Sequence, residues 1–269
     1  FAHGQAFWRK EYRMNLRIAG YDKPVVSLMQ GFTMGGGVGV GCHARHRIVG
    51  ETSQIAMPEC GIGLVPDVGG SFLLALGPGR LGEYLGTTGT RMGPADAIYA
   101  GFADVFVPQS HWPALIAALV AEGADALGRF VAVAPEGVLA AQQAQIDQHF
   151  GGETLGDILR SLRGDDSAFA QAALKALGRI SPLAGCAAIE IQHRLGDSPT
   201  LTRALELEYR YTHRAQEQGD FLEGIRAAVI DKDRAPCWLH KSIEAVSPAA
   251  VAAMLMPLGA QAWTVEEKL

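Results

Sequence analysis

The residues of this chain best suited to chemistry are three consecutive glycines and two acids, all between positions 35 and 67. Gly35, Gly36 and Gly37 leave their backbone N–H groups open to a ligand, because no Cβ atom blocks close approach. If this bend opens a helix, the first N–H groups lack internal partners and lie at the positive end of the helix dipole. Glu59 and Asp67 follow, each among Pro and Gly residues. Such a set suits acyl chemistry, in which backbone donors hold a carbonyl oxygen and a carboxylate attacks or moves a proton.

Each of these residues also has a structural interpretation. Gly36 could serve only to let a helix pack closely on a strand. Glu59 follows a proline, which prevents a helix from continuing, so the acid lies in a loop where it could simply be solvated. Asp67 could be the N-cap of the helix that follows. If the site is real, apolar neighbours raise the pKa of Glu59, which suits proton transfer near neutral pH.

Two segments carry a family resemblance, PVVSLMQGFTMGGG at 24–37 and AMPECGIGLVPDVGG at 56–70. Both resemble the enoyl-CoA hydratase/isomerase (crotonase) superfamily, and the second is most similar to its 3-hydroxyisobutyryl-CoA hydrolase branch. The resemblance continues to LEYR at 207–210 and DFLEGIRA at 220–227. It implies an α/β fold, a crotonase-like β–β–α spiral, and an acyl-CoA substrate.

The resemblance also assigns roles to four residues. Gly36 falls on the glycine whose N–H forms part of the oxyanion hole. Glu59 falls on the catalytic carboxylate, acting either as general base on a water or as nucleophile on the thioester. Asp67 is implied to be a second active-site acid that binds a 3-hydroxyl group, and Glu11 to contact substrate. Gly39 departs from the hydratases, which carry a second catalytic Glu at this position, and this favours hydrolysis.

We therefore expect hydrolysis of a short 3-hydroxyacyl-CoA, 3-hydroxyisobutyryl-CoA by resemblance, in valine catabolism. CoA is then part of the substrate and product, and neither a cofactor nor a metal is required. Two alternatives stay open: an enoyl-CoA hydratase or isomerase of the same fold, and a non-catalytic acyl-CoA-binding protein. The chain starts at Phe1. We expect the family's N-terminal segment, with its first β–β–α units and the second oxyanion donor, to be missing, so a separate N-terminal fragment of the same protein is a candidate partner.

The composition narrows the class of protein. With 48% hydrophobic and 19% charged residues over 269 positions, a folded core is expected. The net charge of −5 without a basic run argues against nucleic-acid binding, and no apolar run is long enough to cross a membrane. The four cysteines are far apart, which argues against a disulfide framework or a zinc site. We expect a bacterial cytoplasmic protein, or a mitochondrial matrix protein in a eukaryote, and an oligomer is compatible with the sequence.

Two regions are expected to position these residues: a partial crotonase-like core at 1–122 and a helical C-terminal region at 123–269. In the core, the pattern predicts a helix over 5–19 and a short helix over 38–44. It predicts strands at 25–28, 47–49, 54–57 and 104–107. In the first helix Phe7, Met14 and Ile18 form the expected buried stripe, which Glu11 interrupts.

Three further features of the sequence bear on the site. The segment GVGCHA at 39–44 matches a dinucleotide-binding fingerprint with Glu59 twenty residues on, but the helix is too short and no second β-α-β half follows. His43 and His46 are expected at the surface. Glu208 is expected to be a structural ion-pair partner.

Overall fold

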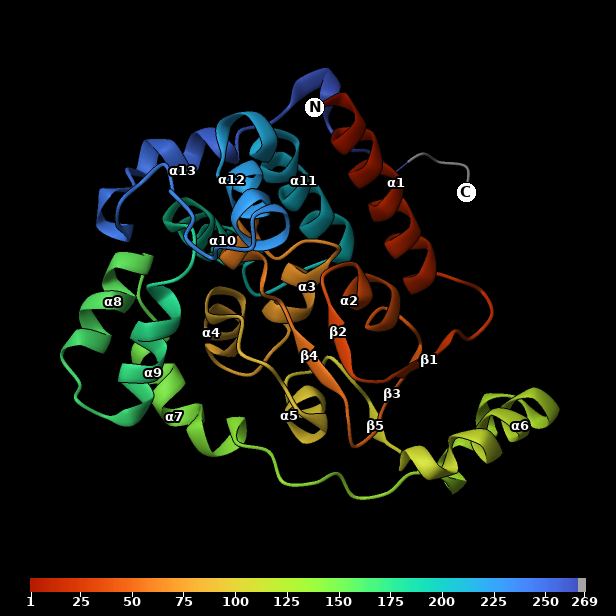
Figure 1. Ribbon diagram of the computed structural model, residues 1–269. Coiled ribbons are helices and arrows are strands. Elements are labelled where there is room, and N and C mark those ends of the chain that lie inside the picture. Colours follow the sequence, from red (N-terminus) through yellow and green to blue (C-terminus); the bar gives the residue numbers. More distant parts are fainter. Residues whose placement is uncertain (266–269) are drawn as a thin grey trace.

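Short parallel strands in the first half of the chain form two small sheets (Figure 1). The computed structural model describes residues 1–265. The first sheet has the order β1-β3-β5 and the second pairs β2 with β4, and every pair is parallel. The strands are β1 (Val26–Met29), β2 (Phe32–Met34), β3 (His46–Val49), β4 (Gln54–Ala56) and β5 (Val105–Phe106). Four of the five strands are predicted to within two residues at each end, and β2 is not predicted.

Helix α1 (Ala2–Ala19) confirms the predicted first helix, but the predicted buried stripe is wrong. Phe7 is 55% exposed and Met14 is 41% exposed. The buried residues are instead Trp8, Tyr12 and Asn15, at spacings of four and three. This spacing also defines one helix face. A buried polar Asn and two aromatic residues with polar atoms form this face, so hydrophobicity alone selected the wrong side.

Short helices follow the strands, and α6 projects away from the sheets beyond β5 (Figure 1). Helix α2 begins at Gly36, two residues earlier than predicted, because the bend at Gly35 has φ 52° and leads directly into the helix. Helix α5 opens with a proline at its first position, where the missing N–H group costs least. The helices are α2 (Gly36–Gly41), α3 (Gly70–Ala75), α4 (Leu81–Thr88), α5 (Pro94–Tyr99) and α6 (Trp112–Glu122).

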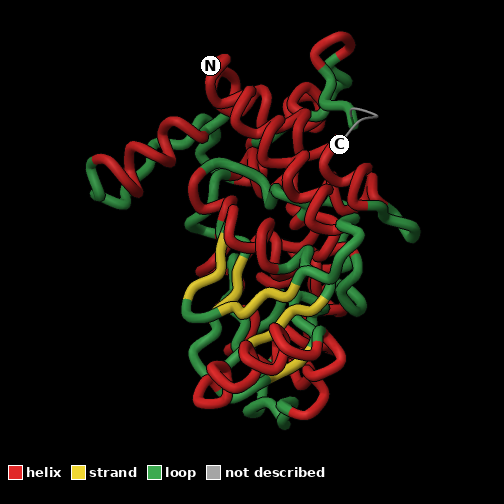
Figure 2. Tube along the Cα trace, turned by 90° about the vertical axis from the view of Figure 1, so that its right-hand side faces the viewer, coloured by secondary structure: helices red, strands yellow, loops and turns green. Residues whose placement is uncertain are grey.

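From residue 123 to residue 265, helices are joined by loops (Figure 2 shows the strands confined to one part of the molecule). Five of these helices start where a Ser or Thr side chain accepts a hydrogen bond from the N–H three residues on. The helices are α7 (Leu139–Phe150), α8 (Leu155–Arg163), α9 (Ala168–Leu177), α10 (Pro182–Leu195), α11 (Leu201–Gln218), α12 (Phe221–Ile225), which a π-helical turn (Arg226–Ile230) extends, and α13 (Pro248–Met254).

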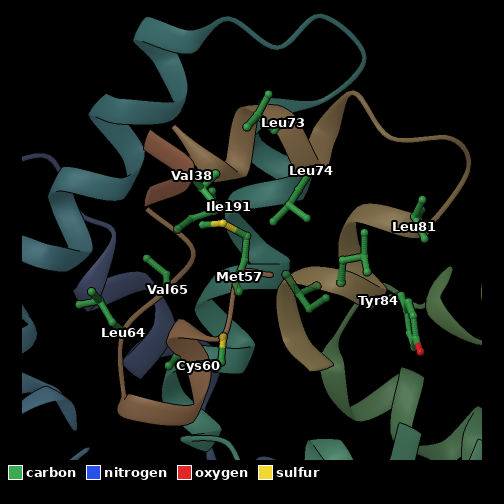
Figure 3. Packing of buried hydrophobic residues seen from close by; sticks show 14 of the residues in the cluster. Val38, Met57, Cys60, Leu64, Val65, Leu73, Leu74, Leu81, Tyr84 and Ile191 are labelled. Carbon is green, nitrogen blue, oxygen red and sulfur yellow. The ribbon is translucent and has the colours of Figure 1, made fainter. Parts of the chain in front are cut away.

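One apolar cluster joins both regions of the chain. It includes Trp8 of α1, Met57 and Cys60 near β4, and Ile191 of α10. Figure 3 shows the side chains of Met57 and Cys60 among helices from both regions. A smaller cluster, formed by Ile48, Val107, Leu115 and Leu127, lies under α6. Within residues 1–265, no single helix is long and apolar enough to cross a membrane; α9 and α10 pass that test only as a pair bent by 112°.

Candidate active site

The pairing of β2 with β4 brings the glycine bend next to Glu59. The two strands are parallel, with Met34 opposite Ala56. Parallel neighbours end at the same edge of a sheet, so the residues after Met34 and those after Ala56 emerge side by side. The first are the glycines that open α2, and the second lead into a 3₁₀ turn, η1 (Glu59–Ile62).

Glu59 is buried at the start of η1, with 4% of its surface exposed. Its Oε1 atom would be 3.5 Å from a Cβ atom on Gly35, and its Oε2 atom has no hydrogen-bond partner among residues 1–265. Burial raises the pKa of Glu59 to about 8, and the charge of Glu208 adds to the rise. Hydrogen bonds from the backbone of Glu59 itself and of Gly35 oppose it. Glu59 is therefore a carboxyl group that changes charge near neutral pH, with one oxygen atom free to react.

Gly36, the first residue of α2, faces Glu11. A Cβ atom on Gly36 would be 3.0 Å from Oε1 of Glu11, so a side chain there would displace this acid. The N–H group of Gly36, in the first turn of α2, has no carbonyl group of a preceding helical turn to bond. Glu11 is half-buried on α1, and burial raises its pKa. The structure thus places Gly36 between two of the acids selected from the sequence, Glu11 on one side and Glu59 beyond Gly35.

Asp67 is buried in the loop before α3 and does not cap that helix. The N-cap of α3 is Gly69, without a side-chain bond, so the N-cap interpretation of Asp67 is wrong. Its Oδ2 atom accepts a hydrogen bond of 2.9 Å from the hydroxyl group of Tyr12. Burial raises the pKa of Asp67 well above its ordinary value. The charges of Glu59, Glu208 and Glu11 raise it further, so the four sequence-distant acids act on one another electrostatically.

Between the loop that carries Asp67 and the start of α3, the backbone has an unusual conformation. Val68 has a φ of 54° and Gly69 a φ of 77°. A positive φ is rare for a β-branched residue and needs support from its surroundings. The ring of His43 supplies it, since Nε2 lies 2.8 Å from the carbonyl oxygen of Val68. His43 is buried, contrary to the prediction, and burial lowers its pKa. His46 is partly buried in β3.

Glu208 supports the same loop from α11, and among residues 1–265 it forms hydrogen bonds and no ion pair. Its carboxylate accepts hydrogen bonds from the N–H groups of Gly69 (2.8 Å) and Ser71 (3.0 Å) and from the Ser71 hydroxyl. Burial raises the pKa of Glu208 to about 7, although these hydrogen bonds oppose the rise. The ion-pair prediction for Glu208 is therefore wrong. Nothing in the local sequence indicated these partners, because they lie 137 and 139 positions away.

Gly39 has no space for a side chain. A Cβ atom there would be 2.5 Å from Nδ2 of Asn15 and 2.8 Å from Cβ of Val68. Gly39 and Gly41 both lie inside α2. Since a dinucleotide fingerprint needs its first glycines in the turn before a helix, this placement excludes that interpretation of residues 39–44.

The C-terminal region holds η1 from the other side. The N–H of Ser181 donates to the carbonyl group of Cys60 (2.8 Å), and the hydroxyl group of Tyr211 donates to the carbonyl group of Gly63 (3.2 Å). Ser181 is itself fixed by Asp220, which accepts its hydroxyl group at 2.6 Å. Gly224 packs so closely that a Cβ atom would be 2.1 Å from the carbonyl oxygen of Ile62. The helical region thus fixes the turn that carries Glu59.

Comparison with known proteins agrees with this arrangement. A family model described as enoyl-CoA hydratase/isomerase matches residues 2–255. The chain belongs to the enoyl-CoA hydratase/isomerase family. A solved structure named as an enoyl-CoA hydratase from Rhodobacter sphaeroides is 63% identical, with a TM-score of 0.95 over 98% of this chain and 77% of the other. A second, named as a carnitinyl-CoA dehydratase from Mycobacterium thermoresistibile, is 38% identical, with a TM-score of 0.93 over 99% and 77%. The predicted crotonase-like α/β fold is confirmed.

Curated relatives of this chain are named differently from the two solved structures. The mitochondrial 3-hydroxyisobutyryl-CoA hydrolase of Xenopus tropicalis is 37% identical over 95% of this chain and 69% of its own length. The same enzyme of Rattus norvegicus is 36% identical over 96% and 70%. The protein is thus an enzyme of the crotonase family. Its relatives are named both as hydrolases and as hydratases or dehydratases.

Proposed function

We propose that this protein hydrolyses a short-chain 3-hydroxyacyl-CoA thioester, with 3-hydroxyisobutyryl-CoA as substrate, to the free hydroxy acid and CoA. The observation that carries the proposal is the buried carboxyl group of Glu59 beside the glycine bend, with Gly39 closed to any side chain. The names of the curated relatives support the same activity. The CoA is part of the substrate and product, and the proposed reaction needs no further cofactor.

In the proposed reaction the carbonyl oxygen of the thioester accepts a hydrogen bond from the N–H of Gly36. This donor stabilises the negative charge that develops on the oxygen. The ionised form of Glu59 either takes a proton from the attacking water or attacks the carbonyl carbon itself, giving a mixed anhydride that water then opens. In both cases the C–S bond breaks and CoA leaves as a thiolate. A thiol pKa of about 8.5 makes this leaving group easy to expel.

Asp67 and Glu11 are proposed to position the substrate. Asp67 is buried beside Tyr12, and its raised pKa favours the neutral carboxyl form, which can both donate and accept a hydrogen bond. That form suits a substrate hydroxyl group. Glu11 lies against Gly36, where the acyl group would enter.

A hydratase is the second candidate, because the solved relative that is 63% identical carries that name. Hydration adds water across a carbon–carbon double bond and leaves the thioester intact. By resemblance, hydratases of the family carry a second acid at the position that Gly39 occupies in this chain. The contacts of Gly39 with Asn15 and Val68 leave no space for one, so we place hydrolysis first.

Two assays on one sample distinguish these activities. Protein expressed from its whole gene is mixed with 3-hydroxyisobutyryl-CoA and free thiol is followed with a thiol reagent. In parallel, an α,β-unsaturated acyl-CoA is supplied and loss of the double-bond absorbance is followed. Thiol release in the first assay supports hydrolysis. Loss of absorbance alone would establish hydration instead, and calorimetric binding of both esters without either reaction would establish a non-catalytic acyl-CoA-binding protein.

A further inference from the structure

Asn15 is a fully buried amide whose polar atoms are unused. Its exposed surface is 0%, and neither Nδ2 nor Oδ1 has a hydrogen-bond partner among the described residues. Buried side-chain amides in folded proteins are nearly always paired, so an exception calls for an explanation. Since no described residue bonds to this amide, its polar atoms add nothing to the packing of α1.

The amide lies at the candidate active site. Its Nδ2 atom is the nearest atom to the position of a Cβ on Gly39, and Val68 borders the same point. Val68 directly follows Asp67. Tyr12, one turn earlier on the same buried face of α1, donates its hydroxyl group to Asp67. Asn15 is thus enclosed by α2 and by the loop that carries Asp67.

Two contacts between α1 and α2 are aligned. Glu11 faces Gly36. Asn15, four residues after Glu11, faces Gly39, which is three residues after Gly36. Each step is about one helical turn, roughly 5 Å along the helices. If the N–H of Gly36 holds the thioester oxygen, the acyl carbons beyond the carbonyl group pass toward Gly39 and the amide. A hydroxyl group on the third carbon is separated from the carbonyl oxygen by a similar distance.

We propose that Asn15 recognises the 3-hydroxyl group of the substrate and so determines specificity for 3-hydroxyacyl thioesters, an inference that rests on the proposed function. An amide offers a donor and an acceptor, which matches a hydroxyl group that both donates and accepts. Asp67 makes one hydrogen bond with the substrate hydroxyl group, as donor or acceptor, and Asn15 makes the other. A thioester without the hydroxyl group would leave the buried amide unpaired, so the site rejects it.

The test compares two substrates and two proteins. The wild type and Asn15→Leu, which keeps the branched shape and removes the polar atoms, are assayed with 3-hydroxyisobutyryl-CoA and with isobutyryl-CoA, which lacks only the hydroxyl group. The wild type is expected to prefer the hydroxylated ester by about tenfold or more in kcat/KM. In Asn15→Leu, kcat/KM for 3-hydroxyisobutyryl-CoA is expected to fall, whereas kcat/KM for isobutyryl-CoA changes little. The preference is then lost. Asn15→Ala is expected to give the same pattern, and Met14→Leu, next to it on the exposed face, is the unchanged control.

Two results overturn the inference. Equal loss on both esters shows that the amide serves packing only, and an unchanged preference shows that it does not contact the hydroxyl group. Failure of the proposed function looks different, because the wild type then releases thiol from neither ester. In that case the same pairwise comparison is made on Kd by calorimetry, where loss of the preference in Asn15→Leu still supports recognition and its persistence refutes it.

Discussion

The carboxylate of Glu59 lies against Gly35: its Oε1 atom would be 3.5 Å from a Cβ atom on that glycine. The two residues are 24 positions apart, and the parallel pairing of Met34 with Ala56 brings them together. One consequence is electrostatic, because the backbone of Gly35 supplies one of the hydrogen bonds that limit the rise in the pKa of Glu59. A second is chemical, since a reactive acid lies next to the start of α2.

Removal of the reactive acid should abolish most of the activity. Glu59→Gln keeps the size of the side chain but cannot take up a proton or attack a carbonyl carbon. We expect thiol release from 3-hydroxyisobutyryl-CoA to fall by about a hundredfold to ten-thousandfold in kcat. Glu51→Gln changes an exposed acid and should leave the rate unchanged. Activity of Glu59→Gln within a fewfold of wild type would exclude Glu59 as base or nucleophile.

The rate should increase with pH. Burial holds the pKa of Glu59 at about 8, and both proposed roles need the ionised form. We therefore expect kcat/KM to rise through this range and to level off above it, after correction for the chemical hydrolysis of the thioester. The profile is measured from pH 6 to 9 with a substrate well below KM. A flat profile, or one that falls with rising pH, would contradict this role of Glu59.

The same shift predicts a stability change of opposite sense. Below its unfolded pKa near 4.5, Glu59 is protonated in both the folded and unfolded states. As pH rises toward about 8, only the unfolded state loses the proton, so folding becomes less favourable by up to a few kcal/mol. Glu59→Gln lacks this effect. We expect its stability advantage over wild type, measured by urea unfolding, to be larger at pH 8.5 than at pH 5.5; an equal difference at both values would refute the shift.

Contact between α12 and η1 should matter for catalysis. Gly224→Ala places a Cβ atom 2.1 Å from the backbone carbonyl of Ile62, which cannot move without shifting η1. We expect a loss of about 1–3 kcal/mol in stability and a lower kcat with a smaller change in KM, because Glu59 is displaced. Gly61→Ala is the matched control in the same turn, since within residues 1–265 no atom other than those of its chain neighbours lies within 4 Å of its Cβ position. Equal effects of the two substitutions would show that η1 tolerates displacement.

A second acid at position 39 should not create a hydratase. The first side-chain carbon of Gly39→Glu would be within 2.5 Å of Asn15 and 2.8 Å of Val68. Val68 is already held at a positive φ, so it has little freedom to move. We expect a lower melting temperature and no gain in hydration of an α,β-unsaturated acyl-CoA. A variant that melts at the wild-type temperature and hydrates this substrate would favour the hydratase assignment.

The sequence by itself determined most local features of this protein. Helix α1 ends at its predicted residue, and β1, β3 and β4 lie within one residue of their predicted starts. Gly, Pro, Ser and Thr at element ends act through neighbouring backbone atoms, and such effects can be inferred from a short window. The glycine bend and the two acids were selected for the same reason, because their chemistry is visible in the residue types.

Only the tertiary structure decided which groups meet. Strand β2 has three residues between glycines, so its pattern was too short to detect, yet its pairing with β4 sets Glu59 beside the bend. The buried face of α1, and with it Tyr12 and Asn15, depends on what α2 and α11 present to it. Glu208 binds N–H groups almost 140 positions away. Burial and long-range pairing come from chain segments that a local pattern does not contain, and they also set the pKa values on which the proposed chemistry depends.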